Sequence, residues 1–201
     1  MKVSTKLNSL VLAATLVTPF AVRAESTTAT AAAPTALATS ARVDFSIVIP
    51  RILFLRVGST GVTIDPITFN VAAAVVGNGV AQGGGGGNLG GGAVTAIVQG
   101  NAGNATLTVS TLGALQTVGG TINYTEIVTT PTALAGFGTL LNAPALANGA
   151  GGTVALTAVG NIVNSGATWT YTYANSTVPV AGTYGGVNAQ NSRVTYTVTA
   201  P

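Results

Sequence analysis

Residues 168–173 are Thr-Trp-Thr-Tyr-Thr-Tyr, a strict alternation of threonine with aromatic side chains. Successive side chains of a β-strand point to opposite faces, so this period places Trp169, Tyr171 and Tyr173 together on one face. Residues 193–199, Arg-Val-Thr-Tyr-Thr-Val-Thr, repeat the pattern with valine and tyrosine. Because β-branched and aromatic residues favour strands, both stretches predict strands with one apolar face each.

Similar short stretches recur along the chain, separated by glycine, asparagine and proline, which favour turns. They comprise residues 52–57, 62–64, 67–76, 94–98, 105–111, 121–128 and 153–159. No stretch has helical spacing with caps, although residues 134–146 are compatible with a short turn of helix. The pattern therefore predicts an all-β protein. Several short strands with glycine-rich turns commonly form a single antiparallel β-sandwich, which we expect to be immunoglobulin-like and to span residues 42–201.

Residues 1–24 are typical of a secretory signal peptide. Lys2 and Lys6 precede an apolar stretch, and Val22-Arg23-Ala24 offers small residues at the two positions that a signal peptidase recognises. The apolar stretch is shorter than the roughly 20 residues of a membrane span and contains Pro19. We therefore expect cleavage after Ala24, no transmembrane anchor after cleavage, and secretion to the periplasm, the cell surface or the extracellular medium.

Two segments of the secreted chain are expected to be flexible. Residues 25–41 are rich in alanine and threonine and contain one large apolar residue, Leu37. Such a segment buries too little surface to offset the entropy of ordering it. Residues 77–92 are dominated by glycine, which is typical of a solvated loop between two strands.

The residue inventory excludes most catalytic chemistry. The chain has no histidine and no cysteine, and its two lysines lie in the expected signal peptide. Nucleophilic catalysis by Ser–His or Cys–His pairs, Schiff-base chemistry, phosphate-binding P-loops and the usual zinc sites each need one of these residues. Asp44, Asp65 and Glu126 could supply a carboxylate pair, but their positions favour a solvated strand face and turns. We predict that the chain is not an enzyme and has no catalytic residues, no cofactor and no metal.

The net charge of +3 belongs to the expected signal peptide. Beyond residue 24 the chain carries four basic and four acidic residues and is neutral: Arg42, Arg51, Arg56 and Arg193 against Glu25, Asp44, Asp65 and Glu126. A neutral chain lacks the basic surface that nucleic acids require, so we expect no nucleic-acid partner. It also lacks the charges that usually protect strand edges from association. These properties favour association with further copies of the chain or with related surface subunits.

Two places in the sequence carry a resemblance to a known class of proteins. The sequence Ala181-Gly-Thr-Tyr-Gly-Gly186, followed by residues 193–201, resembles the last hairpin of many bacterial exported β-sandwich domains. The order of signal peptide, polar arm and first alternating strand is similar in layout to fimbrial (pilin-like) subunits. The resemblance covers about forty residues. This chain departs from many fimbrial subunits in having no disulfide, because it has no cysteine.

The resemblance implies assembly by strand donation, in which one subunit completes the sheet of the next. Val43, Phe45, Ile47 and Ile49 are the best candidates for the donated strand, because they alternate with other residues and Pro50 ends the run. The alternative interpretation, which we favour on the sequence alone, is that these residues form the first strand of the chain's own sandwich.

Two functions remain open on the sequence. The first is a secreted, non-enzymatic structural subunit of a surface fibre, coat or biofilm matrix that assembles through edge-strand pairing. The second is a soluble secreted binding module, for example for carbohydrate, with Trp169, Tyr171 and Tyr173 as a stacking platform if their face points to solvent. The alternative, which we favour for these three side chains, is burial in the core.

Overall fold

The computed structural model describes residues 26–201 and divides the chain into two compact units, Met1–Ile49 and Pro50–Pro201. Within the first unit, the described residues 26–49 contain neither helix nor strand. A turn at residues 33–35 reverses the chain, and the Thr39 hydroxyl donates a hydrogen bond of 2.9 Å to the carbonyl oxygen of Thr27. The predicted signal peptide and Glu25 lie outside the described residues.

The second unit contains a six-stranded sheet built around two long antiparallel strands, β5 (Ala93–Gly100) and β12 (Val163–Tyr173). Strand β1 (Leu53–Val57) pairs with the other side of β5 and forms one edge of the sheet. Two strands pair with the far side of β12: β9 (Ile127–Ala133) runs antiparallel to it and β10 (Thr139–Leu140) runs parallel. Strand β3 (Gln82–Gly83) pairs antiparallel with Thr172 and Tyr173 on the side opposite β9, beyond the end of the β5 pairing.

A three-stranded antiparallel sheet has the order β11–β6–β13, with β6 (Ala105–Thr111) between β11 (Ala150–Leu156) and β13 (Val194–Thr199). Two further two-stranded sheets pair β2 (Ile67–Thr68) with β4 (Gly85–Gly86), and β7 (Leu115–Thr117) with β8 (Gly120–Ile122). The helices among the described residues are two short 3-10 turns, η1 (Ala73–Val75) and η2 (Tyr124–Glu126). The predicted all-β class is confirmed.

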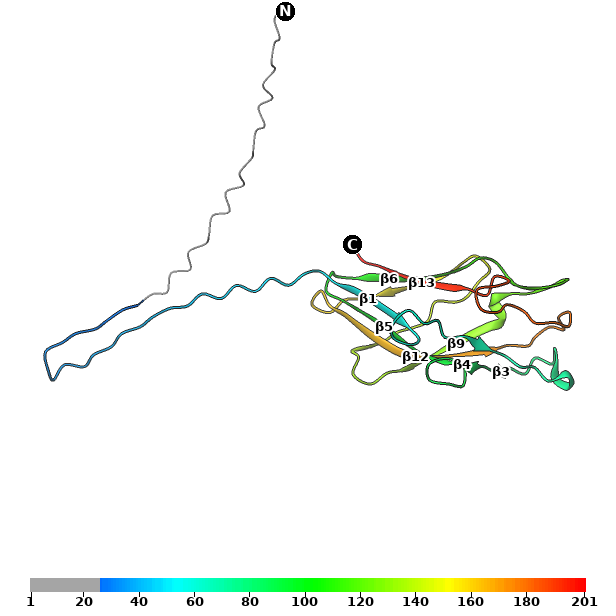
Figure 1. Cartoon of the computed structure of the whole chain (residues 1–201), viewed down its shortest axis with the longest axis horizontal. Coiled ribbons are helices and arrows are strands. Elements are labelled where there is room, and N and C mark those ends of the chain that lie inside the picture. Colours follow the sequence, from blue (N-terminus) through cyan, green and yellow to red (C-terminus); the bar gives the residue numbers. More distant parts are fainter. Residues whose placement is uncertain (1–25) are drawn as a thin grey trace, which may run out of the picture. The chain divides into compact units, whose positions relative to one another are not determined.

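Side chains from the two larger sheets meet in one hydrophobic core. In Figure 1, β6 and β13 lie on one side of this unit and β1, β5 and β12 on the other. The Trp169 ring of β12 is fully buried and lies 5.2 Å, centroid to centroid, from the ring of Tyr196 on β13. Val98 of β5 and Leu107 of β6 are buried in the same cluster. Apolar strand faces of the two sheets are therefore covered by one another.

Five of the predicted strands agree closely with the structure. Residues 52–57 contain β1, residues 94–98 lie in β5, residues 105–111 are β6, residues 168–173 end β12, and residues 194–199 of the last alternating stretch are β13. Strand β13, however, pairs with β6, while residues 181–186 lie in a loop. The expected final hairpin is therefore wrong, because the last strand joins a different sheet from the strand that precedes it.

The prediction of a first strand over residues 42–49 is wrong. These residues contain no strand and belong to the unit that ends at Ile49, whereas the sheets begin after Pro50. An alternating sequence describes side-chain direction only. A strand also needs a neighbouring backbone to pair with, and residues 42–49 pair with no other strand within residues 26–201.

Several other predicted elements differ in the structure. Residues 62–64 form no strand, residues 73–75 and 124–126 are 3-10 turns, and residues 157–159 follow the end of β11. Residues 134–146 contain the short strand β10 and no helix. In the turn η2, Tyr124 is buried and donates a hydrogen bond of 2.8 Å from its hydroxyl to the Asn191 carbonyl oxygen. Tertiary contacts of this kind override local strand preference.

The glycine-rich residues 77–92 form paired structure instead of the expected solvated loop. They contribute β3 and β4, and the Gly87 N–H donates a hydrogen bond of 3.1 Å to the Pro66 carbonyl oxygen. Gly87 has a φ of +77°, and a Cβ at that position would lie 2.2 Å from the carbonyl oxygen of Ala93. Glycine therefore permits a close approach of backbone to backbone at this point.

Candidate functional site

Residues 43–49, hereafter the apolar segment, expose large hydrophobic side chains just before the second unit. Phe45 is 89% and Ile47 is 84% exposed, and Val43, Val48 and Ile49 are also exposed. Asp44 and Ser46 separate the first three members of the alternating set. Burial of one such side chain contributes roughly 1.5–3 kcal/mol, so a row of them in water favours a partner surface. The apolar segment is the candidate that the sequence identified for strand donation.

The predicted aromatic face lies inside the protein. Trp169 is 0%, Tyr173 5% and Tyr171 7% exposed. The indole Nε1 of Trp169 donates a hydrogen bond of 2.8 Å to the Leu141 carbonyl oxygen, deep in the core. The stacking platform proposed for a carbohydrate is therefore wrong for these residues. Strand β12 lies in the middle of its sheet and its aromatic face is turned toward the second sheet.

The tyrosine hydroxyls on this face are bound within the core. The hydroxyls of Tyr171 and Tyr196 lie 2.9 Å apart in a hydrogen bond. Burial raises the pKa of Tyr171 to about 12, although the bond to Tyr196 acts in the opposite direction. Burial also raises the pKa of Tyr196, and the neighbouring Tyr171 adds to that shift. Both groups are thus held neutral in the folded chain at ordinary pH and act as structural polar contacts.

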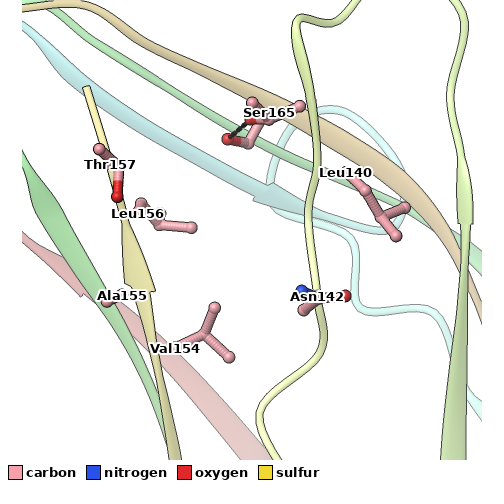
Figure 2. Close-up of a pocket in the computed structure, with 8 residues that line it drawn as sticks. Leu140, Asn142, Val154, Ala155, Leu156, Thr157 and Ser165 are labelled. Atoms are coloured by element: carbon pink, nitrogen blue, oxygen red, sulfur yellow. Dashed lines mark hydrogen bonds between the residues drawn. The ribbon is translucent and has the colours of Figure 1, made fainter. Parts of the chain in front are cut away.

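Two adjoining cavities lie between β10, at the edge of the larger sheet, and β11, at the edge of the smaller one. The first has a volume of about 200 Å³. Figure 2 shows Leu140 and Asn142 on one side of it and Val154–Thr157 on the other, with Ser165 of β12 at one end. A hydrogen bond of 2.6 Å joins the Thr139 and Ser165 hydroxyls beside it.

The second cavity has a volume of about 410 Å³ and continues from the first, since Thr139 and Thr157 line both. Its other lining residues include Val159 and Ile162 in the turn between β11 and β12, both exposed. We call the combined hollow the β10–β11 groove. It contains no charged residue among its lining and exposes several aliphatic side chains. Sequence reasoning missed it because its walls come from separate stretches of the chain.

Among the strands of five or more residues in the two larger sheets, β1, β9, β11 and β13 each pair along one edge only within residues 26–201. Charge or proline lies close to three of them, and β9 follows Glu126 and contains Pro131. Pro50, Arg51 and Arg56 lie before or within β1, and the Arg51 guanidinium donates a hydrogen bond to the carbonyl oxygen of Pro201, just beyond β13. Arg193 immediately precedes β13. Strand β11 differs, because no charged residue lies between Glu126 and Arg193.

The carboxylates of the second unit hold turns. The Asp65 carboxylate accepts hydrogen bonds from the N–H of Ser59 at 2.5 Å and from its hydroxyl at 2.8 Å. The Glu126 carboxylate accepts from the N–H of Ser176 at 3.0 Å and from the Ser176 hydroxyl. Within residues 26–201 no group of three potential metal-ligating side chains comes together. Each carboxylate is thus committed to a local loop contact.

The described part of the chain includes no helix of the length and apolar character that a membrane span requires.

Two features of the described residues have no role assigned so far: the exposed apolar segment and the β10–β11 groove. No family model, no curated protein and no solved structure matches this chain.

Proposed function

We propose that this chain is a secreted, non-enzymatic structural subunit of a surface fibre, coat or biofilm matrix. Its copies assemble with one another, or with related subunits, by pairing strand edges. The observation that carries the proposal is the exposure of the alternating apolar side chains of residues 43–49. A seven-residue stretch of this kind is suited to adding a strand to a sheet edge, where backbone hydrogen bonds and alternate side chains both contribute.

The distribution of charge supports association. Residues 26–201 contain four arginines and three carboxylates, so copies of the chain repel one another weakly. The proposal also includes cleavage of the signal peptide after Ala24, export, and assembly outside the cytoplasm. We further propose that the two larger sheets form a sandwich similar to that of fimbrial subunits. The binding-module alternative is not carried forward, because burial of Trp169, Tyr171 and Tyr173 removes the residues on which it rested.

The proposal is tested by comparing the secreted chain with a Phe45→Asp/Ile47→Asp double variant in negative-stain electron microscopy and sedimentation velocity. Carboxylates at these positions would have to be buried without a partner on assembly, which costs several kcal/mol. We expect regular fibres from the unmodified chain and monomers from the variant. Both proteins should keep the same circular dichroism, because the substituted residues are exposed.

A matched control carries the same chemistry elsewhere. Val62→Asp/Val118→Asp replaces two aliphatic side chains that are 100% and 92% exposed in other loops, and it should still form fibres. Monodisperse monomers from the unmodified chain would overturn the proposal, as would fibres from the Phe45→Asp/Ile47→Asp variant.

A further inference from the structure

The free strand edges of the two larger sheets are not equivalent as sites for an added strand. Natural sheets protect exposed edges with charge, proline or short strands. Edges β1 and β13 have arginine and proline residues close by, and the Arg51–Pro201 hydrogen bond connects their ends. Edge β9 contains Pro131, and β3 and β10 are only two residues long. Edge β11 has the sequence Ala-Gly-Gly-Thr-Val-Ala-Leu over Ala150–Leu156, with neither charge nor proline. By this criterion β11 is the unprotected edge among the strands of residues 26–201.

The space beside β11 is hollowed by the β10–β11 groove. The start of β11 is covered, since the Gly152 N–H donates a hydrogen bond of 2.7 Å to the Ala145 carbonyl oxygen. From Thr153 onward the strand borders the β10–β11 groove, whose lining includes Val154, Leu156 and Thr157. The open edge and the aliphatic groove together offer both things that an added strand needs: backbone groups to pair with and a hollow for its apolar side chains.

The apolar segment matches this space in length and chemistry. The open part of β11 from Thr153 to Leu156, together with the following Thr157, has five residues, as does the part of the apolar segment from Phe45 to Ile49. In an extended conformation Phe45, Ile47 and Ile49 share one face and would enter the groove. Asp44 and Ser46 would lie on the opposite face, so no charge would be buried in a groove that has no charged partner to offer.

We infer that the β10–β11 groove of one copy receives residues 43–49 of a second copy, which pair along the β11 edge. This inference rests on the proposed self-assembly and names its acceptor. The donor and the acceptor are different surfaces of the same chain, so the contact is heterologous and repeats from copy to copy without closing by two-fold symmetry.

The absence of cysteine from the chain permits a direct test by cross-linking. The secreted chain is made as the double variant Ile47→Cys/Thr157→Cys and treated with a short thiol-specific cross-linker. Thr157 lines both cavities and is exposed, so the substitution leaves the core untouched. We expect a ladder of covalent multimers, because each chain would then be joined to two neighbours. Each single-cysteine variant should stop at dimers.

The matched control is Ile47→Cys/Thr197→Cys, which makes the same exposed threonine substitution on β13, the opposite edge of the same sheet. It should give no ladder beyond dimers. A second groove variant, Val159→Asp, places an unpaired carboxylate at an exposed lining position and should abolish fibres with unchanged circular dichroism.

The outcomes separate the two proposals. A ladder from Ile47→Cys/Thr197→Cys and none from Ile47→Cys/Thr157→Cys, together with normal fibres from Val159→Asp, would overturn the groove as acceptor. Self-assembly itself would still stand. Cross-linked monomers, in which Cys-to-Cys contact forms within one chain, would overturn donation between copies. A chain that forms neither fibres nor ladders would overturn both the acceptor and the proposed function.

Discussion

At the scale of the residue, Gly87 shows what glycine contributes within the glycine-rich stretch. The pair of contacts around it is tight, with the Pro66 carbonyl accepting its N–H and the Ala93 carbonyl facing its Cα. A run of glycine usually indicates freedom of movement. Here the absence of a side chain allows β2, β4 and the start of β5 to lie close together, so the glycine acts as a packing residue.

A substitution at Gly87 tests this role. Gly87→Ala should lower the free energy of unfolding by on the order of 3 kcal/mol or more, because it adds a clash with the Ala93 oxygen to the backbone strain. Gly79→Ala is the control: its φ of +74° is nearly the same, and no atom lies within 4 Å of the added Cβ. Its cost should be the strain alone, about 1–2 kcal/mol. If urea unfolding gave the same loss of unfolding free energy for both variants, the close approach of Gly87 to the Ala93 carbonyl oxygen would be contradicted.

The buried tyrosines give a pH dependence that can be measured. The pKa of Tyr171 is raised by burial from its ordinary value of 10.0 to about 12 in the folded chain. The unfolded chain therefore loses the proton first, and the stabilisation that is fully present below pH 10 is lost as the pH rises toward 12.

The free energy of unfolding should accordingly fall by about 1.4 kcal/mol per pH unit for this group over that range. Urea unfolding at about pH 9 and about pH 11, with tyrosinate absorbance recorded in parallel, measures the fall. Tyr171→Phe should show a shallower fall, since it removes the shifted group. A free energy of unfolding independent of pH across this range would contradict the burial of the hydroxyl.

At the scale of the element, the sequence predicted best those strands whose side-chain alternation coincides with a buried face. Strands β6 and β13 and residues 168–173 of β12 alternate, and inward side chains such as Leu107 and Trp169 are buried. The two-residue strands β3, β4 and β10 could not be predicted, because their pairing depends on where β2 and β12 pass in the folded chain. Local sequence carries no record of such neighbours.

The candidate site likewise has one part that the sequence identified and one part that it did not. Residues 43–49 were identified from alternation alone, although as a strand of the chain's own sheet they were wrongly assigned. The β10–β11 groove was not identified, because Thr139, Thr157 and Ile162 come together only through the crossing from β10 to β11 and the turn into β12. Alternation distinguishes two faces without saying which is covered, but the preference of large aromatic side chains for the core favoured burial of the aromatic face, and the structure confirms it.

At the scale of the whole molecule, scarcity of charge determines how assembly should respond to salt. The contact proposed between copies is apolar, and no charged side chain lines the groove. Raising sodium chloride from about 0.05 M to about 1 M screens exposed charges and should leave the fraction of assembled chain unchanged or higher. Sedimentation velocity at the two concentrations measures this fraction. Disassembly in high salt would indicate that ion pairs hold the copies together.

One consequence of carrying the apolar segment and the groove on the same chain concerns the two ends of a filament. At one end the last subunit presents an empty groove, and at the other the last subunit presents an unpaired segment. Such a filament is directional, and its ends grow by different steps: one by capturing a segment, the other by inserting one. A molecule that offers a matching strand but has no groove would therefore terminate growth at one end only, and the length of the filament would be set by its abundance.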